Sequence, residues 1–401
     1  MLLLAGFALK AQCTSPEGWD GRQYGRLCYN DIQALYDGRE IDRDVFPYVH
    51  GELRTDPETS LVGGAIEYPV LTGIFMWATG LLVNDFNDYL RVSALLLAPF
   101  ALATAALLAR MTARRALMWA AAPALALYAF HNWDLLAVCA AVVAIWMWWR
   151  DRHVAAAVAI GVGAVLKLYP LLLLAPLVLY VLSRSGLRRA SRVAGAGVGT
   201  MVAFNLPFAL INFDGWWATY EFHSNRTGNY DSIWTLGWPS LSAETLNLIT
   251  LGLTAAFCLG ALAWGWWKRE GSIYPFLPVA GALVAAFLLW NKVHSPQYTL
   301  WILPFFVLLR VRVGWWIAYS LVDLAVYVGV FRWFYEYLYE SKDFTFFKKL
   351  MIAGVWGRAV VLLALYVVFL RARPALERFL SQPPDNVGGV GDRLSAQARS
   401  S

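Results

Sequence analysis

Three carboxylates stand at the edges of apolar segments, where a side chain can lie at a membrane surface and still meet a polar substrate. Asp31 ends the segment CYND, Glu67 opens EYP, and Asp134 closes HNWD. A carboxylate in such a place could accept a proton from a hydroxyl group as a general base. Asp31 could equally cap a helix or be solvated, and Glu67 could simply favour a helix N-terminus. The residues alone leave these alternatives open.

A second group of polar side chains could bind an anion such as a phosphate. A lysine ammonium is a compact partner for a lipid phosphate at the membrane surface. A lone histidine is more often structural than a ligand, and Lys167 could merely extend toward the interface. The group comprises Lys292, His294, Gln297 and Tyr298 in NKVHSPQY, Lys167 in LKLYP, Arg226 in HSNRTGNYD and His131 in HNWD. We expect no metal, because Asp134 does not belong to a paired-carboxylate motif, and no cofactor.

The composition requires that these residues be positioned by a membrane protein. Of the 401 residues, 59% are hydrophobic and 15% are charged, whereas soluble domains carry roughly 25% charged residues. The net charge of +6 does not indicate nucleic-acid binding, because the basic residues lie in short loops between apolar runs. We therefore expect an all-α integral membrane protein, a multi-span helical bundle with membrane lipids around it.

The hydropathy pattern predicts eleven spans. A helix needs about 20 apolar residues to cross a bilayer, and MLLLAGFAL at the start is too short to do so. We therefore interpret it as a shortened first helix. With a complete first helix the protein would have twelve spans and both chain ends would be cytoplasmic. Residues 1–380 are expected to form one domain and 381–401 a disordered cytoplasmic tail. The predicted spans are 92–109, 116–130, 135–149, 154–168, 171–183, 193–211, 244–266, 273–290, 298–309, 314–331 and 350–370.

Loop charges orient the bundle. Arginine and lysine recur in every second loop, as is typical of cytoplasmic loops. Two large loops lie on the opposite side of the membrane in this scheme, 10–90 and 212–242. From residue 11 onward, the first loop contains thirteen Asp or Glu but only five Arg. All the candidate residues fall on this side, so a site there would be extracytoplasmic, in the cell membrane.

The apolar segment 67–83 cannot cross the membrane without breaking the alternation of cytoplasmic and external loops, because both of its flanks must lie outside. We interpret it as an interfacial or re-entrant helix beside the bundle. The alternative is a true span, in which case one later span is miscounted.

Two further pairs are expected. Cys13 and Cys28 could form a disulfide in an oxidising compartment, or be unrelated thiols. Asp323 and Arg358 each lie eight residues from the outer end of a predicted span, at a depth of about 12 Å. An isolated charge at that depth is costly, so we expect the two to pair.

Several strings resemble a known family, the actinobacterial glycosyltransferases of family 87, which use polyprenyl-phosphate sugars and belong to the C-type fold superfamily. The matching strings are spread over residues 28–304: CYNDI, EYPVLTG, AFHNWDLLAV, LKLYPLLLLAPL and NKVHSPQYTLWILP. The resemblance implies a bundle of about 11–12 transmembrane helices with external juxtamembrane helices. It also implies that Asp31 occupies the position of the catalytic carboxylate in the first external loop, with a second acid, Asp134, in the next.

The implied reaction moves a sugar, most readily mannose, from a polyprenyl phosphate to a cell-envelope glycan or glycolipid, with inversion at the anomeric carbon. Asp31 would act as the base, and Lys292, His294, Arg226 and Lys167 would stabilise the departing phosphate. Two alternatives stay open. The sugar could be arabinofuranose or another pentose or hexose, or the protein could instead transport a lipid-linked glycan. Transporters commonly contain inverted repeats, and no such repeat is evident in the sequence.

Overall fold

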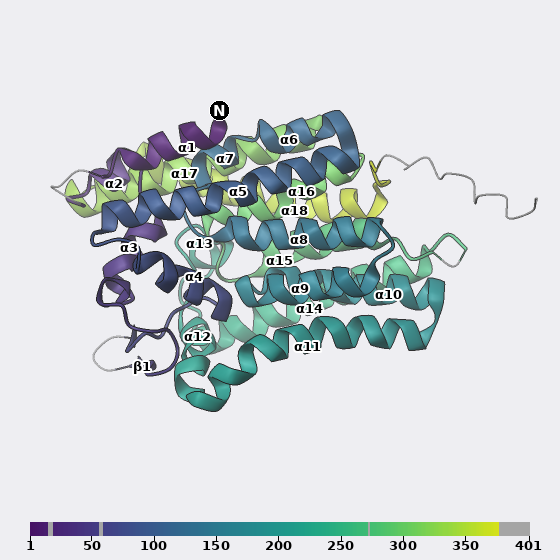
Figure 1. The fold of residues 1–401 in the computed structure, drawn as a ribbon. Coiled ribbons are helices and arrows are strands. Elements are labelled where there is room, and N and C mark those ends of the chain that lie inside the picture. Colours follow the sequence, from purple (N-terminus) through teal and green to yellow (C-terminus); the bar gives the residue numbers. More distant parts are fainter. Residues whose placement is uncertain (15–18, 56–58, 272, 377–401) are drawn as a thin grey trace, which may run out of the picture.

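The chain folds into a helical bundle with a smaller set of elements collected at one end (Figure 1). A computed structural model describes residues 1–14, 19–55, 59–271 and 273–376. The predicted tail, 381–401, lies outside these residues. The bundle helices are α1 Leu2–Ala11, α5 Phe86–Thr112, α6 Leu117–Ala120, α7 Pro123–Tyr128, α8 Asp134–Trp149, α9 His153–Leu166, α10 Leu174–Ser185, α11 Leu187–Ile211, α14 Ala243–Trp267, α15 Phe276–Trp290, α16 Thr299–Leu308, α17 Val313–Tyr339 and α18 Phe346–Arg371.

The elements at the end of the bundle come from the two segments predicted as large external loops, 10–90 and 212–242. They are α2 Arg22–Gly25, α3 Asp31–Gly38, β1 Glu52–Arg54, β2 Ser60–Val62, α4 Val70–Gly80, α12 Phe213–Asn225 and α13 Ile233–Gly237. The two strands form an antiparallel hairpin in which Leu53 pairs with Leu61. Four 3-10 helices complete the described elements: η1 Ile41–Arg43, η2 Ala113–Ala116, η3 Tyr169–Leu173 and η4 Pro296–Tyr298.

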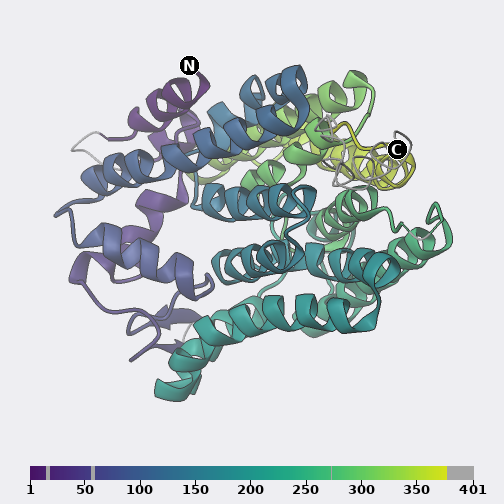
Figure 2. The ribbon, with the colours of Figure 1, turned by 45° about the vertical axis from the view of Figure 1, so that its right-hand side comes forward.

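The helix lengths and composition confirm an all-α integral membrane protein. Within the described part of the chain, five helical segments are long and apolar enough to cross a bilayer, and seven further apolar helical segments have 10–17 residues. In the candidate span of 187–211 only 6% of the most apolar window is buried within the protein, so most of that helix is left to face lipid. Helices α8, α9 and α11 lie side by side in that order (Figures 1 and 2).

One predicted span is wrong, because it is not a single continuous helix. Residues 116–130 do not make one helix but two short ones, separated at Ala121–Ala122. Pro123 begins the second of them. Proline lacks an amide hydrogen and disfavours the helical conformation in the residue before it, so a continuous helix is interrupted there.

The segment predicted as an interfacial helix forms the 11-residue helix α4. Such a helix is about 16 Å long and cannot cross a hydrocarbon core of about 30 Å. The Thr72 hydroxyl donates to the carbonyl of Leu166, 2.6 Å away at the end of α9, and this bond anchors α4 beside that end of α9. A side chain at Gly73 would collide with the Tyr48 hydroxyl, so glycine is needed for this close packing.

Hydrogen bonds at one end of the bundle join segments that were assigned to the same side of the membrane. The Arg115 guanidinium donates to the carbonyls of Phe306, Val307 and Leu309, and Leu309 pairs with Pro374. Arg115 and Pro374 come from segments that were predicted to be cytoplasmic. Leu309 ends the predicted span 298–309, which was expected to reach the same side. At the other end of the bundle, the predicted disulfide between Cys13 and Cys28 is present.

Candidate active site

A cavity of about 620 Å³ lies where the smaller elements collected at one end of the bundle meet the ends of the bundle helices. Seven of the predicted residues line it: Asp31, Glu67, His131, Lys167, Arg226, Gln297 and Tyr298. They come from six separate stretches of the chain, so the fold has brought together side chains that are up to 267 positions apart. Asp134, Lys292 and His294 do not line this cavity.

Asp31 is held in place by its own helix and by the HNWD turn. It is the first residue of α3, and the side chain of the preceding Asn30 caps that helix by accepting from the amide of Gln33 at 2.8 Å. The Asp31 amide donates to the carbonyl of His131 at 2.8 Å. Asn30, rather than Asp31, is thus the capping residue, and the Asp31 carboxylate is left to face the cavity.

The Asp31 carboxylate accepts hydrogen bonds from two side-chain amides. The Asn132 Nδ2 group lies 2.7 Å from Oδ2, and the Gln297 Nε2 group lies 3.4 Å from the same oxygen. Burial raises the pKa of Asp31 above its ordinary value, while Asn132 and the charge of Lys167 oppose that rise. A carboxylate with a raised pKa is a stronger proton acceptor.

The other two candidate acids are held by cations. Glu67 forms a bidentate ion pair with Arg39. Asp134 is buried, and it accepts from Lys167 at 2.9 Å and from the indole of Trp301 at 2.6 Å. Asp134 lies behind the cavity wall, where its carboxylate holds the Lys167 ammonium in place.

Arg226 is the most available cation of the cavity. Its guanidinium donates to the Asn229 side chain at 2.5 Å, and within the described part of the chain it forms no ion pair. Lys167 also lines the cavity, but its charge is already opposed by Asp134. An anion in the cavity would therefore gain most from Arg226.

Lys292 lies behind the Arg226 loop and not in the cavity wall. Its ammonium donates to the carbonyls of Ser224 and Arg226, at 3.2 and 2.6 Å. Burial, together with the charge of Arg226, lowers the pKa of Lys292 to about 8. The lysine thus fixes the backbone that carries Arg226.

His294 and His131 are both buried near cations, Arg358 and Lys10 respectively. Burial lowers the pKa of each well below the ordinary value. The Nδ1 atom of His294 lies 2.8 Å from the carbonyl of Leu288, away from the cavity, whereas Nδ1 of His131 lies 3.2 Å from the buried ammonium of Lys10. A neutral imidazole does not offer a positive charge to a phosphate.

Sequence reasoning missed three residues that shape the site. Asn132 and Tyr68 stand inside strings that were already singled out, HNWD and EYP, and the Asn132 amide also donates to the Tyr68 hydroxyl at 2.7 Å. Lys10 is fully buried and donates to the Tyr29 carbonyl at 2.8 Å. A lysine directly after an apolar run was the available signal for Lys10, but it is also an ordinary sign of a helix end.

Comparison with known proteins decides to which class of protein the chain belongs. The profile of glycosyltransferase family 87 matches residues 67–291, more than half of the chain. The chain belongs to glycosyltransferase family 87. It is therefore a membrane glycosyltransferase, and no curated protein matches it.

The family 87 match covers part of the cavity. Glu67, His131, Lys167 and Arg226 fall within it, and Asp31, Gln297 and Tyr298 fall outside. Among the residues that the structure describes, no cluster of three or more His, Cys, Asp or Glu is arranged to hold a metal ion. The roles of the cavity residues rest on their geometry.

Proposed function

We propose that this glycosyltransferase moves a sugar, most readily mannose, from a polyprenyl-phosphate donor to a cell-envelope glycan or glycolipid outside the cytoplasm. The observation that carries the proposal is the pairing, in one cavity, of a carboxylate held by amides with a guanidinium that lacks an ionic partner among the described residues. A sugar phosphate needs both, a base for the incoming hydroxyl and a cation for the departing phosphate.

The reaction is a single displacement. The acceptor hydroxyl oxygen bonds to the anomeric carbon as the bond from that carbon to the phosphate oxygen breaks. The hydroxyl proton passes to the Asp31 carboxylate, and the phosphate leaves with the bonding electrons toward Arg226, with Lys167 nearby. Attack from the face opposite the leaving group inverts the anomeric centre.

The surroundings favour a lipid-linked donor. The cavity lies at the ends of apolar helices, and the end of a membrane-spanning helix is where a lipid phosphate would be met. The Cys13–Cys28 disulfide in the same region is typical of an oxidising compartment, where nucleotide sugars are absent. Membership of a transferase family disfavours the transport alternative, while a pentose such as arabinofuranose stays an alternative sugar.

A panel of donors tests this proposal. Purified protein in proteoliposomes would be given polyprenyl-phosphate mannose, polyprenyl-phosphate arabinofuranose or a nucleotide-linked mannose, with a cell-envelope extract as the source of acceptor. We expect transfer of label from polyprenyl-phosphate mannose. Transfer from arabinofuranose alone would replace the sugar, and transfer from the nucleotide donor alone would refute the lipid donor.

Asn132→Ala is expected to move the acidic limb of the pH profile of kcat/KM to higher pH. Asn132 donates a hydrogen bond that lowers the pKa of Asp31. Without it that pKa rises further, so the base becomes protonated, and inactive, at a higher pH. Asn205→Ala is the matched control, because the Asn205 amide contacts Trp216 and lies outside the cavity. An acidic limb that stays in place in Asn132→Ala would contradict this role of Asn132.

Lys292→Met is expected to raise the apparent KM for the lipid donor roughly tenfold, because hydrogen bonds from charged groups contribute about 1.5–3 kcal/mol. If Lys292 acts by positioning Arg226, adding Lys292→Met to Arg226→Ala should cause little further loss. Losses that multiply in the double variant would mean that Lys292 contacts the phosphate itself. Lys342→Met, at an exposed site, is the control.

A further inference from the structure

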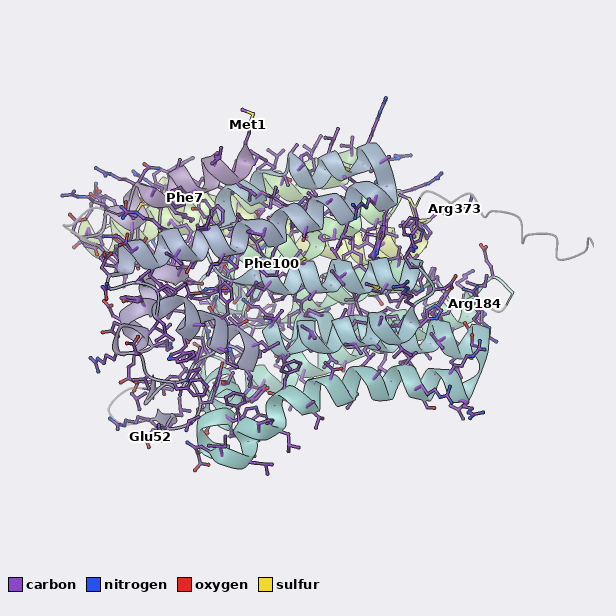
Figure 3. All side chains as sticks on the ribbon, viewed as in Figure 1. Met1, Phe7, Glu52, Phe100, Arg184 and Arg373 are labelled. Carbon is purple, nitrogen blue, oxygen red and sulfur yellow. A yellow bond between two sulfur atoms is a disulfide. The ribbon has the colours of Figure 1, made fainter. Side chains whose placement is uncertain are left out.

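A second cavity, of about 640 Å³, lies at the opposite end of the bundle from the candidate active site. It is framed by the turn between α8 and α9 and by the turn between α10 and α11. Arg184, one of its lining residues, projects at this end in Figure 3, whereas Glu52 of the external hairpin marks the other end. The two cavities are therefore separate sites.

The second cavity is strongly cationic. Arg152, Arg189 and Arg192 line it, and within the described residues none of the three forms an ion pair. The fourth arginine, Arg184, is already bonded to Asp151, at 2.8 Å. Asp151 also lines the cavity, but Arg184 already opposes its charge, so the three other guanidinium groups give the hollow a positive balance.

The backbone adds to this positive potential. The first residues of α9 and the first two turns of α11 both contribute to the lining. The N-terminus of a helix carries a partial positive charge and favours a nearby anion. Charged side chains and helix ends therefore select the same kind of ligand.

The walls of the cavity are apolar and continue onto lipid-facing surface. Val154, Val181 and Val193 belong to the lining, and Val154 is 49% exposed. One turn farther along α9, Val158 is also exposed. On the other side of the cavity, little of the apolar part of helix α11 is buried against the rest of the protein. A ligand with an anionic head and an apolar tail fits this combination better than a free anion.

We propose that this second cavity binds the headgroup of an anionic phospholipid, with its phosphate among Arg152, Arg189 and Arg192 and its acyl chains along α9 and α11. Arginine presents a planar fork that matches phosphate oxygens, and basic pockets between membrane helices suit such headgroups. Arginines beside spans also orient a protein in the membrane. These three differ from the other arginines at this end because they share one cavity and none of them forms an ion pair among the described residues.

Lipid binding to the purified full-length protein tests the proposal. Native mass spectrometry would count the cardiolipin, phosphatidylglycerol and phosphatidylcholine molecules retained, and thermal unfolding would be followed as each is added. We expect the anionic lipids to be retained and to stabilise the protein. The triple variant Arg152→Gln, Arg189→Gln, Arg192→Gln should bind them roughly a hundredfold more weakly, at about fivefold per cation near the surface.

A second triple variant, Arg110→Gln, Arg114→Gln, Arg312→Gln, removes the same charge from other loops at this end and should bind lipid as the unmodified protein does. Equal weakening in the two variants would overturn the proposal, because the attraction would then be that of the whole surface. Equal retention of phosphatidylcholine would also overturn it. Stabilisation by inorganic phosphate to the same extent would assign the cavity to a soluble anion instead. Unfolding without added lipid establishes that each variant is folded.

Discussion

Asp31→Asn is expected to lower kcat by about a hundredfold to ten-thousandfold, the usual effect of losing a general base. Asparagine has nearly the same size and keeps an oxygen that can accept from Asn132 and Gln297, so the cavity should persist. It cannot take up the proton of the acceptor hydroxyl. The variant should therefore insert, fold and bind the lipid donor normally while turning over very slowly.

The control for this result is Asp37→Asn, because Asp37 lies on the same helix, α3, but is exposed and outside the cavity. Asp37→Asn should have ordinary turnover. Ordinary turnover in Asp31→Asn as well would remove Asp31 from the mechanism. Glu67 and then Asp134 would be the next acids to substitute, although both already hold cations, Arg39 and Lys167. Full activity in all three single variants would leave the proposed mechanism without a base.

Arg358→Leu is expected to destabilise the protein by about 3–5 kcal/mol, the usual cost of leaving a buried charge without its partner. Arg358 is buried, and its guanidinium donates to the Asp231 carbonyl at 2.7 Å. It also lies 3.6 Å from the Asp231 carboxylate and 4.0 Å from that of Asp323. Removing it leaves two buried carboxylates without the cation that they share.

The double variant Asp323→Leu, Arg358→Leu should be tolerated better than Arg358→Leu alone, because it removes one of the two stranded charges. It should not recover fully, since Asp231 remains. The free energy of unfolding in mixed micelles measures both effects, with Arg371→Leu, exposed at the end of the same helix, as the control. A double variant less stable than the single one would show that the carboxylate of Asp323 is stabilised by groups other than Arg358.

Helix positions followed from the sequence because hydropathy depends only on local composition. The long helices α5, α11, α14, α17 and α18 all cover predicted spans. The prediction that Asp323 and Arg358 approach each other also succeeded, since equal depth on consecutive antiparallel helices needs no knowledge of side-chain direction. The closer partner, Asp231, was missed because it lies in a loop, where depth cannot be counted from helical rise.

Side-chain direction limited the prediction of the site. The NKVHSPQY segment lies at the same end of the bundle as Asp31, as predicted, but only part of it faces the cavity. Gln297 and Tyr298 line the cavity, while Lys292 and His294 turn away from it. These residues lie in a loop and a short 3-10 helix, where no periodicity assigns a face. Asn132 was overlooked for another reason: an amide beside charged neighbours gives no signal of its own, although it forms the shorter of the two amide contacts to Asp31.

The fate of the leaving group tests the central claim most directly. Unmodified protein and Asp31→Asn, reconstituted side by side, would receive polyprenyl-phosphate mannose labelled in the phosphate, with the cell-envelope extract as the source of acceptor. We expect the unmodified protein to release labelled polyprenyl phosphate as mannose is transferred, and Asp31→Asn to release it at least a hundredfold more slowly. Equal release by the two proteins would contradict the account, as would mannose transfer that leaves the labelled lipid donor intact.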